Sequence, residues 1–161
     1  MRELEVYIDG ASKGNPGPSG IGVVVCSDGQ TIKNISAYIG NATNNIAEYS
    51  ALIYGLEEAL KLKAEALKIN TDSQLLYRQI NKVYKVKNPN ILGLYNQVLR
   101  LMEAFKLVSI TNISREDNRG ADKLATKAIK EQLRKKRSFT TGQVESGRPG
   151  YTREESPGSR G

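Results

Sequence analysis

The sequence contains no histidine and only one cysteine among its 161 residues. Without histidine, it offers neither the Ser–His or Cys–His pair of nucleophilic catalysis nor a histidine ligand for a metal ion. The single Cys26 excludes an intramolecular disulfide and a cysteine cluster for zinc. Any hydrolytic chemistry must therefore depend on carboxylates.

Long apolar segments are also absent from the sequence. The first ten residues, MRELEVYIDG, have neither the apolar core nor the small cleavage residues of a signal peptide. No stretch approaches the length of a membrane-spanning helix. We expect a cytoplasmic monomer that does not contact membranes.

The charge is unbalanced, with 24 Lys and Arg against 17 Asp and Glu and a formal net charge of +7. An excess of cations suits a polyanionic partner, because basic side chains along a phosphate backbone release condensed counterions. Many soluble proteins are basic without binding nucleic acid, so the charge alone leaves both interpretations open.

The composition changes near residue 133. Residues 1–133 have the apolar content of one globular domain, whereas residues 134–161 are rich in Gly, Ser, Arg and Glu and begin with the basic cluster RKKR. We predict a catalytic domain over 1–133 and a disordered basic tail over 134–161.

The pattern of apolar residues within 1–133 predicts an α/β fold. Alternation predicts strands near 4–9, 21–26 and 31–39, and residues 27–30 suit a tight hairpin turn. Helical spacing follows over 46–60, then a strand near 66–72, helices from 73 and over 91–105, a strand near 108–113 and a helix from 118. We expect a five-stranded mixed sheet, an antiparallel meander followed by parallel strands, with helices on both faces.

Four acids occupy positions that could converge. Asp9 and Asp72 end predicted strands, and Glu48 and Asp122 lie in the first turns of predicted helices. Sites form beyond the carboxyl ends of parallel strands, and clustered carboxylates repel each other unless cations lie between them. Mg²⁺, which prefers oxygen ligands, is the usual partner of such a cluster.

Each acid also has a structural explanation. Asp9 could be a turn residue before a glycine, and Glu48 could complete a capping box with Asn45. Asp72 could cap the helix that follows it, and Asp122 could favour the positive end of its own helix.

Several short blocks decide between these interpretations, because together they resemble the type 1 ribonucleases H. They follow the order and spacing of that family over roughly residues 4–130: DGAS at 9–12, GNPGP at 14–18, TNNIAEY at 43–49, TDSQ at 71–74, REDN at 115–118 and ADKLA at 121–125. The resemblance implies a ribonuclease H-like fold and hydrolysis of the RNA strand of RNA–DNA hybrids.

The resemblance further implies a two-metal mechanism that leaves 5′-phosphate and 3′-hydroxyl ends. Asp9 would be the central ligand, and Glu48, Asp72 and Asp122 would complete the shell of two Mg²⁺ ions held with substrate, Mn²⁺ being an alternative metal. One ion would activate the attacking water and the other would stabilise the departing oxygen.

The same resemblance implies a set of substrate contacts. An enzyme that requires RNA must sense the 2′-hydroxyl across the minor groove, and neutral amides can both donate and accept hydrogen bonds. The implied contacts are Asn15, Asn44, Asn45 and Gln74, with Thr43 near a phosphate of the DNA strand.

The sequence departs from the family pattern in two ways. Many members carry a histidine in the loop before the last aspartate, and we expect Arg115 or Arg119 to replace it, with Arg119 the catalytic candidate. Arginine attracts a phosphate but cannot exchange a proton near neutrality. Many bacterial relatives also insert a helix and a basic protrusion where this chain has only Lys82, Lys85 and Lys87, which predicts a compact form.

Two other functions are compatible with parts of this pattern. A ribonuclease H-fold module could bind hybrid or double-stranded RNA and cut it poorly, but a binder gains nothing from concentrated negative charge near phosphates. Transposases, integrases and junction resolvases have related acidic sites, but they usually lack the whole TNN and TDSQ set. Cutting of duplex RNA remains open.

Overall fold

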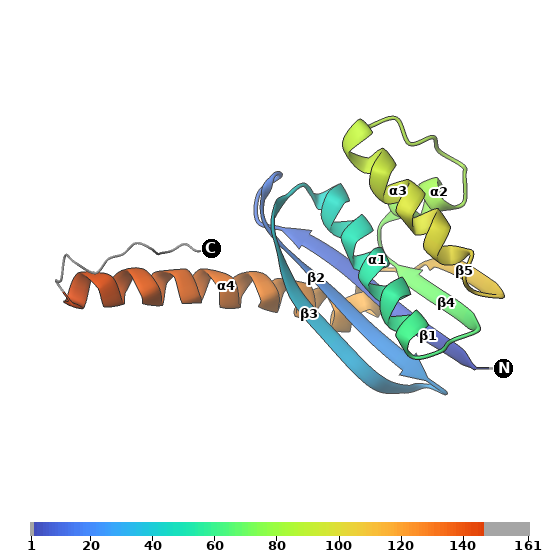
Figure 1. The fold of residues 1–161 in the computed structure, drawn as a ribbon, viewed down its shortest axis with the longest axis horizontal. Helices are drawn as coiled ribbons and strands as arrows, with labels where there is room; N and C mark the ends of the chain where they lie inside the picture. Colours follow the sequence, from blue (N-terminus) through green and yellow to red (C-terminus); the bar gives the residue numbers. More distant parts are fainter. Residues whose placement is uncertain (1, 147–161) are drawn as a thin grey trace. The chain divides into compact units, whose positions relative to one another are not determined.

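One five-stranded sheet of order β3-β2-β1-β4-β5 forms the centre of the fold (Figure 1). The computed structural model describes residues 2–146. Its strands are β1 (Glu3–Ser12), β2 (Gly17–Ser27), β3 (Gln30–Ala42), β4 (Ala66–Thr71) and β5 (Leu107–Asn112). Its helices are α1 (Asn44–Lys61), α2 (Gln74–Ile80), α3 (Pro89–Met102), the 3₁₀ turn η1 (Glu116–Asn118) and α4 (Arg119–Ser146).

The sheet is mixed, as the sequence predicts. β1 pairs antiparallel with β2, and β2 pairs antiparallel with β3. The hairpin between β2 and β3 has its turn at Asp28 (φ 52°) and Gly29 (φ 78°). These two adjacent residues have left-handed backbone conformations, which match the twist of the strands. β1 pairs with β4 and β4 with β5 in parallel, so the carboxyl ends of β1 and β4 lie at one edge.

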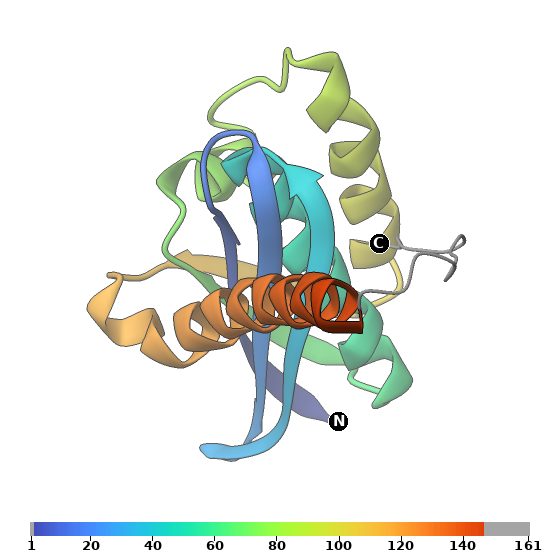
Figure 2. The ribbon, with the colours of Figure 1, turned by 90° about the vertical axis from the view of Figure 1, so that its left-hand side faces the viewer.

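Helices cover both faces of the sheet, which confirms the predicted arrangement (Figure 2). On one face α1 packs closely, since a Cβ on Gly55 would lie 3.2 Å from both Val6 and Ile8. On the other face the first turns of α4 lie against β2. The buried core is continuous from β1 and β2 through α1 to α3.

The helices between β4 and β5 begin at polar caps. Ser73 accepts a hydrogen bond from the Leu76 amide at 3.1 Å and starts α2. Asn88 caps α3, and Pro89 occupies its first turn, so this helix begins two residues before the predicted Ile91. The connecting residues 81–88 contain no helix, which agrees with the predicted compact form.

The chain divides into two units, residues 1–129 and 130–161. The prediction that disorder starts at residue 134 is wrong for 134–146, because α4 continues to Ser146. Lys and Arg, which fill 134–137, have high helix propensity, and no proline interrupts 134–146, although most of 138–146 are weak helix formers. The rest of the expected tail, 147–161, lies outside the described residues. None of the helices over residues 2–146 is long and apolar enough to cross a membrane.

Candidate active site

Asp9 lies within a buried strand rather than at a turn. It is 6% exposed and pairs with Gly22 of β2, and β1 continues past it to Ser12. The interpretation of Asp9 as a turn residue is therefore wrong. The strand holds a carboxylate where burial disfavours its charge.

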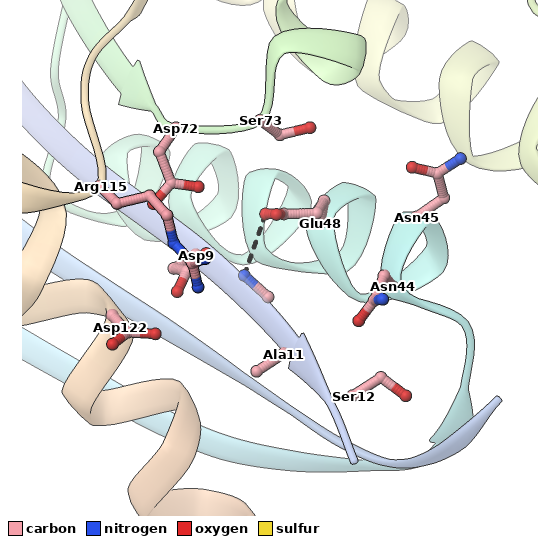
Figure 3. Close-up of a pocket in the computed structure, with 11 residues that line it drawn as sticks. Asp9, Ala11, Ser12, Asn44, Asn45, Glu48, Asp72, Ser73, Arg115 and Asp122 are labelled. Atoms are coloured by element: carbon pink, nitrogen blue, oxygen red, sulfur yellow. Dashed lines mark hydrogen bonds between the residues drawn. The ribbon is translucent and has the colours of Figure 1, made fainter. Parts of the chain in front are cut away.

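Glu48 faces Asp9 because α1 approaches β1 very closely. A Cβ on Gly10 would lie 2.3 Å from the backbone carbon of Ala47, so only glycine allows this approach. The Gly10 amide donates to Glu48 Oε1 at 3.0 Å (Figure 3). The cap of α1 is Thr43, which accepts from the Ile46 amide, so the capping box with Asn45 does not form.

Asp72 follows the last residue of β4 and does not cap α2, because Ser73 does so. The parallel register of β1 and β4 ends with Ile8 opposite Thr71. Asp72 is therefore the next residue beyond the paired end of β4, beside Asp9. The Asn118 side chain donates to Asp72 Oδ2 at 3.2 Å.

Asp122 reaches the same site from the other face of the sheet. A Cβ on Gly22 would lie 2.1 Å from the Ala121 carbonyl oxygen, so this glycine lets α4 approach β2. Since Gly22 is the partner of Asp9 in the sheet, the first turn of α4 brings Asp122 towards Asp9 (Figure 3).

The four carboxylates thus line one cavity of about 420 Å³. Oxygens of Asp9, Glu48 and Asp72 all lie within 4.8 Å of one another. Asp122 lines the cavity but does not belong to this closest group. The sequence pattern predicted the convergence of all four, and the structure brings them together from four separate elements.

The cluster perturbs its own acidity. Burial first, and then repulsion from Glu48 and Asp72, raise the pKa of Asp9 from 3.8 to about 9, and a hydrogen bond with Asp122 acts in the same direction. Burial and repulsion from Asp72 raise the pKa of Glu48 to about 8, although a backbone amide and an arginine oppose the change. Negative charge is costly here without a cation.

The donor set fits a hard divalent cation. It consists of carboxylate oxygens alone, with no sulfur or nitrogen ligand among the residues that line the cavity. Mg²⁺ and Mn²⁺ prefer such oxygens, and a bound cation would remove the repulsion that raises these pKa values. The residues present therefore fit a metal site.

The predicted substrate residues divide into two groups. Asn44 and Asn45 line the cavity, and Asn15 Oδ1 accepts from the Asn44 amide at 3.0 Å. Thr43 is occupied as the cap of α1, and Gln74 is exposed at the start of α2 without lining the cavity.

The two arginines before Asp122 differ in position. Arg115 lines the cavity, its side chain extends towards Asp9 in Figure 3, and its charge lowers the pKa of Glu48 against the larger effects that raise it. Arg119 is exposed and does not line the cavity. Ser12 and Ser73 also line it; both belong to the sequence blocks, and sequence reasoning did not select them.

Comparison with known proteins agrees with this geometry. A family described as reverse transcriptase-like matches residues 7–128. The chain is 43% identical over 129 residues to the bifunctional protein Rv2228c of Mycobacterium tuberculosis, covering 79% of this chain and 35% of that protein. It is 38% identical over 127 residues to ribonuclease HI of Halobacterium salinarum, covering 78% of this chain and 64% of that enzyme.

Solved structures lead to the same family. The structure of LC11-RNase H1 in complex with an RNA/DNA hybrid superposes with a TM-score of 0.77 and 39% identity, covering 81% of this chain and 99% of that one. The fold and the acidic cavity define a ribonuclease H-like domain. The chain belongs to the ribonuclease H family and is similar to its type 1 members.

Proposed function

We propose that this protein is an endoribonuclease that hydrolyses the RNA strand of RNA–DNA hybrids and leaves 5′-phosphate and 3′-hydroxyl ends. The observation that carries the proposal is the group of Asp9, Glu48 and Asp72, with oxygens within 4.8 Å of one another. Asn44 and Asn45 line the same cavity, so polar side chains suited to a nucleic acid adjoin the acids.

Two divalent ions, Mg²⁺ or Mn²⁺, would be held by Asp9, Glu48, Asp72 and Asp122, with Asp9 central among the four. When bound, such ions activate a water and stabilise the departing oxygen. The protein contributes fixed positions for these acids. The Gly10 amide orients Glu48, and burial shields the Asp9 carboxylate from solvent that would compete with a metal ion.

The neutral side chains would recognise the hybrid. Asn44 and Asn45 can donate to and accept from ribose hydroxyls and base edges. Asn15 would act with them, since its side chain already holds the Asn44 amide at 3.0 Å. Gln74 is exposed next to Ser73, which lines the cavity, and would contact the nucleic acid where it extends beyond the site. Thr43 would act near a DNA phosphate through its position at the start of α1.

Arg115 or Arg119 would attract the product phosphate in place of the family histidine. Arg115 is the stronger candidate of the two because it lines the cavity. Overall attraction to the hybrid would come from the net charge of +7, including the exposed Lys82, Lys85 and Lys87 of the short loop after α2.

The test is cleavage of an end-labelled RNA–DNA hybrid with Mg²⁺, with Mn²⁺ and with a chelator. Asp9→Asn should abolish metal-dependent cutting, whereas Asp28→Asn, the same change at an exposed hairpin turn, should retain it. Duplex DNA should remain intact, and duplex RNA measures the breadth of the substrate range.

Binding of the hybrid without cutting in either metal would contradict the proposal and favour a binding module. Cutting of a DNA strand would instead favour the chemistry of transposases and resolvases. Equal activity of the parent and Asp9→Asn would show that the carboxylate cluster is not the active site.

A further inference from the structure

Asn118 connects three of the elements that carry the carboxylates. It ends η1, immediately before α4, and is a buried residue with 1% exposure. Its Nδ2 donates to the Ile8 carbonyl at 2.9 Å and to Asp72 Oδ2 at 3.2 Å. Ile8 precedes Asp9 in β1, and Asp122 follows Asn118 by one helical turn.

These hydrogen bonds lie just beyond the end of the strand pairing that precedes Asp72. The parallel register of β1 and β4 ends at Ile8 and Thr71, so Asp72 is the first residue beyond it. Among the described residues, Asn118 is the side chain that donates a hydrogen bond to the Asp72 carboxylate. Within the described residues, this amide is therefore placed to fix the direction of the Asp72 carboxylate.

The chemistry of the amide suits this role. A lysine or arginine at 118 would also donate to Asp72, but its charge would compete with a metal ion for the same carboxylate and would be costly to bury. An amide supplies the donor without a charge. Asn118 Oδ1 is buried with no partner in the described part of the chain, so both hydrogen bonds of this side chain are donated by its Nδ2.

We infer that Asn118 is a positioning residue, which holds the Asp72 carboxylate towards Asp9 and Glu48 so that the three ligands are arranged before a cation binds. This inference rests on the proposed function only because it treats the cluster of Asp9, Glu48 and Asp72 as a metal site. Partners that orient metal ligands commonly change metal affinity by about 10–100-fold when they are removed.

Asn112 provides a matched control at the same strand end. Its Nδ2 donates to the Thr71 carbonyl at 3.1 Å, so it also ties β4 to its surroundings through an asparagine amide. It lies in β5 and does not line the acidic cavity. Loss of Asn112 therefore removes a similar structural hydrogen bond without releasing Asp72.

The experiment measures Mn²⁺ binding without nucleic acid, by following free Mn²⁺ through its electron paramagnetic resonance signal. Asn118→Ala should weaken binding by about tenfold or more, and Asn112→Ala should change it less than about twofold. Thermal unfolding verifies that each variant is folded. Asn118→Ser, a smaller change that keeps a hydroxyl, is the second variant if Asn118→Ala does not fold.

A double-mutant cycle with Asp72→Asn tests whether Asn118 acts through Asp72. The inference requires that Asn118→Ala cause little further loss once Asp72 has been changed. Fully additive losses, or equal effects of Asn112→Ala and Asn118→Ala, would overturn it. Because the readout is metal binding, a protein that binds Mn²⁺ in this pattern but leaves RNA intact would contradict the proposed function alone.

Discussion

Replacing Asp9 with asparagine should make the metal-free protein more stable at alkaline pH, although Asp9 is central to the proposed site. Burial and repulsion from Glu48 and Asp72 raise the pKa of Asp9 from 3.8 to about 9. At neutral pH the folded chain therefore keeps a proton that the unfolded chain has released. The stability linked to such a group is fully present below about pH 4 and is lost as the pH rises through about 9.

The size of the effect follows from the same values. One pKa unit corresponds to about 1.4 kcal/mol, so between 3.8 and pH 7 the linkage at Asp9 amounts to at most about 4.5 kcal/mol. Part of this penalty comes from repulsion between Asp9 and Glu48. Glu48 keeps its own raised pKa of about 8. We expect asparagine to recover about 2 kcal/mol, or about 6 °C in melting temperature for a chain of this size.

The assay is thermal unfolding followed by circular dichroism in a chelator at pH 5, 7 and 9. The melting temperature of the parent should fall towards pH 9, and the advantage of Asp9→Asn should grow over the same range. Saturating Mg²⁺ should stabilise the parent more than the variant. Asp28→Asn should show no advantage at any pH. A variant equal to or less stable than the parent at pH 9 without metal would refute the argument.

Three further predictions concern the surroundings of the site. Gly10→Ala should cost about 1–3 kcal/mol of stability and weaken Mn²⁺ binding, because the new Cβ would lie 2.3 Å from the Ala47 backbone. Gly93→Ala should do neither, because its new Cβ would meet nothing within 4 Å beyond its own stretch of helix. Arg115→Ala should slow multiple turnover of the hybrid more than a single turnover, and Arg119→Ala tests the alternative; equal losses in both regimes would exclude a role in product release. Deletion of residues 138–161 should preserve a cooperative melt, and its loss would show that the first unit needs the rest of the chain.

The sequence predicted most of the fold because its apolar periodicities are strong. Alternation at Leu4, Val6 and Ile8 and helical spacing along α1 correspond to faces that are buried. The end of α4 was mispredicted because tail-like composition coexists with residues of high helix propensity. Composition shows that a segment has no hydrophobic core of its own. A helix that begins against a core can nevertheless continue past it.

The acids of the site were predictable because they lie in blocks with a recognisable order, whereas their supports were not. Nothing in the sequence shows that Gly10 and Gly22 permit close contacts with α1 and α4, since these contacts join residues far apart in the chain. For the same reason Asn118 was not selected, although it lies in one of the blocks. The choice between Arg115 and Arg119 depends on the path of one loop, which periodicity does not determine.

The four acids are distributed over nearly the whole first unit, from β1 to the start of α4. During synthesis, Asp122 is the last of them to leave the ribosome, so the set of four acids is complete only after the start of α4 has been made. A cation held by acids from these separate elements would bind the folded chain and not the unfolded one, and would stabilise it by mass action. Resistance to proteolysis should therefore rise with metal concentration, and fragments that lack α4, and with it Asp122, should gain less protection.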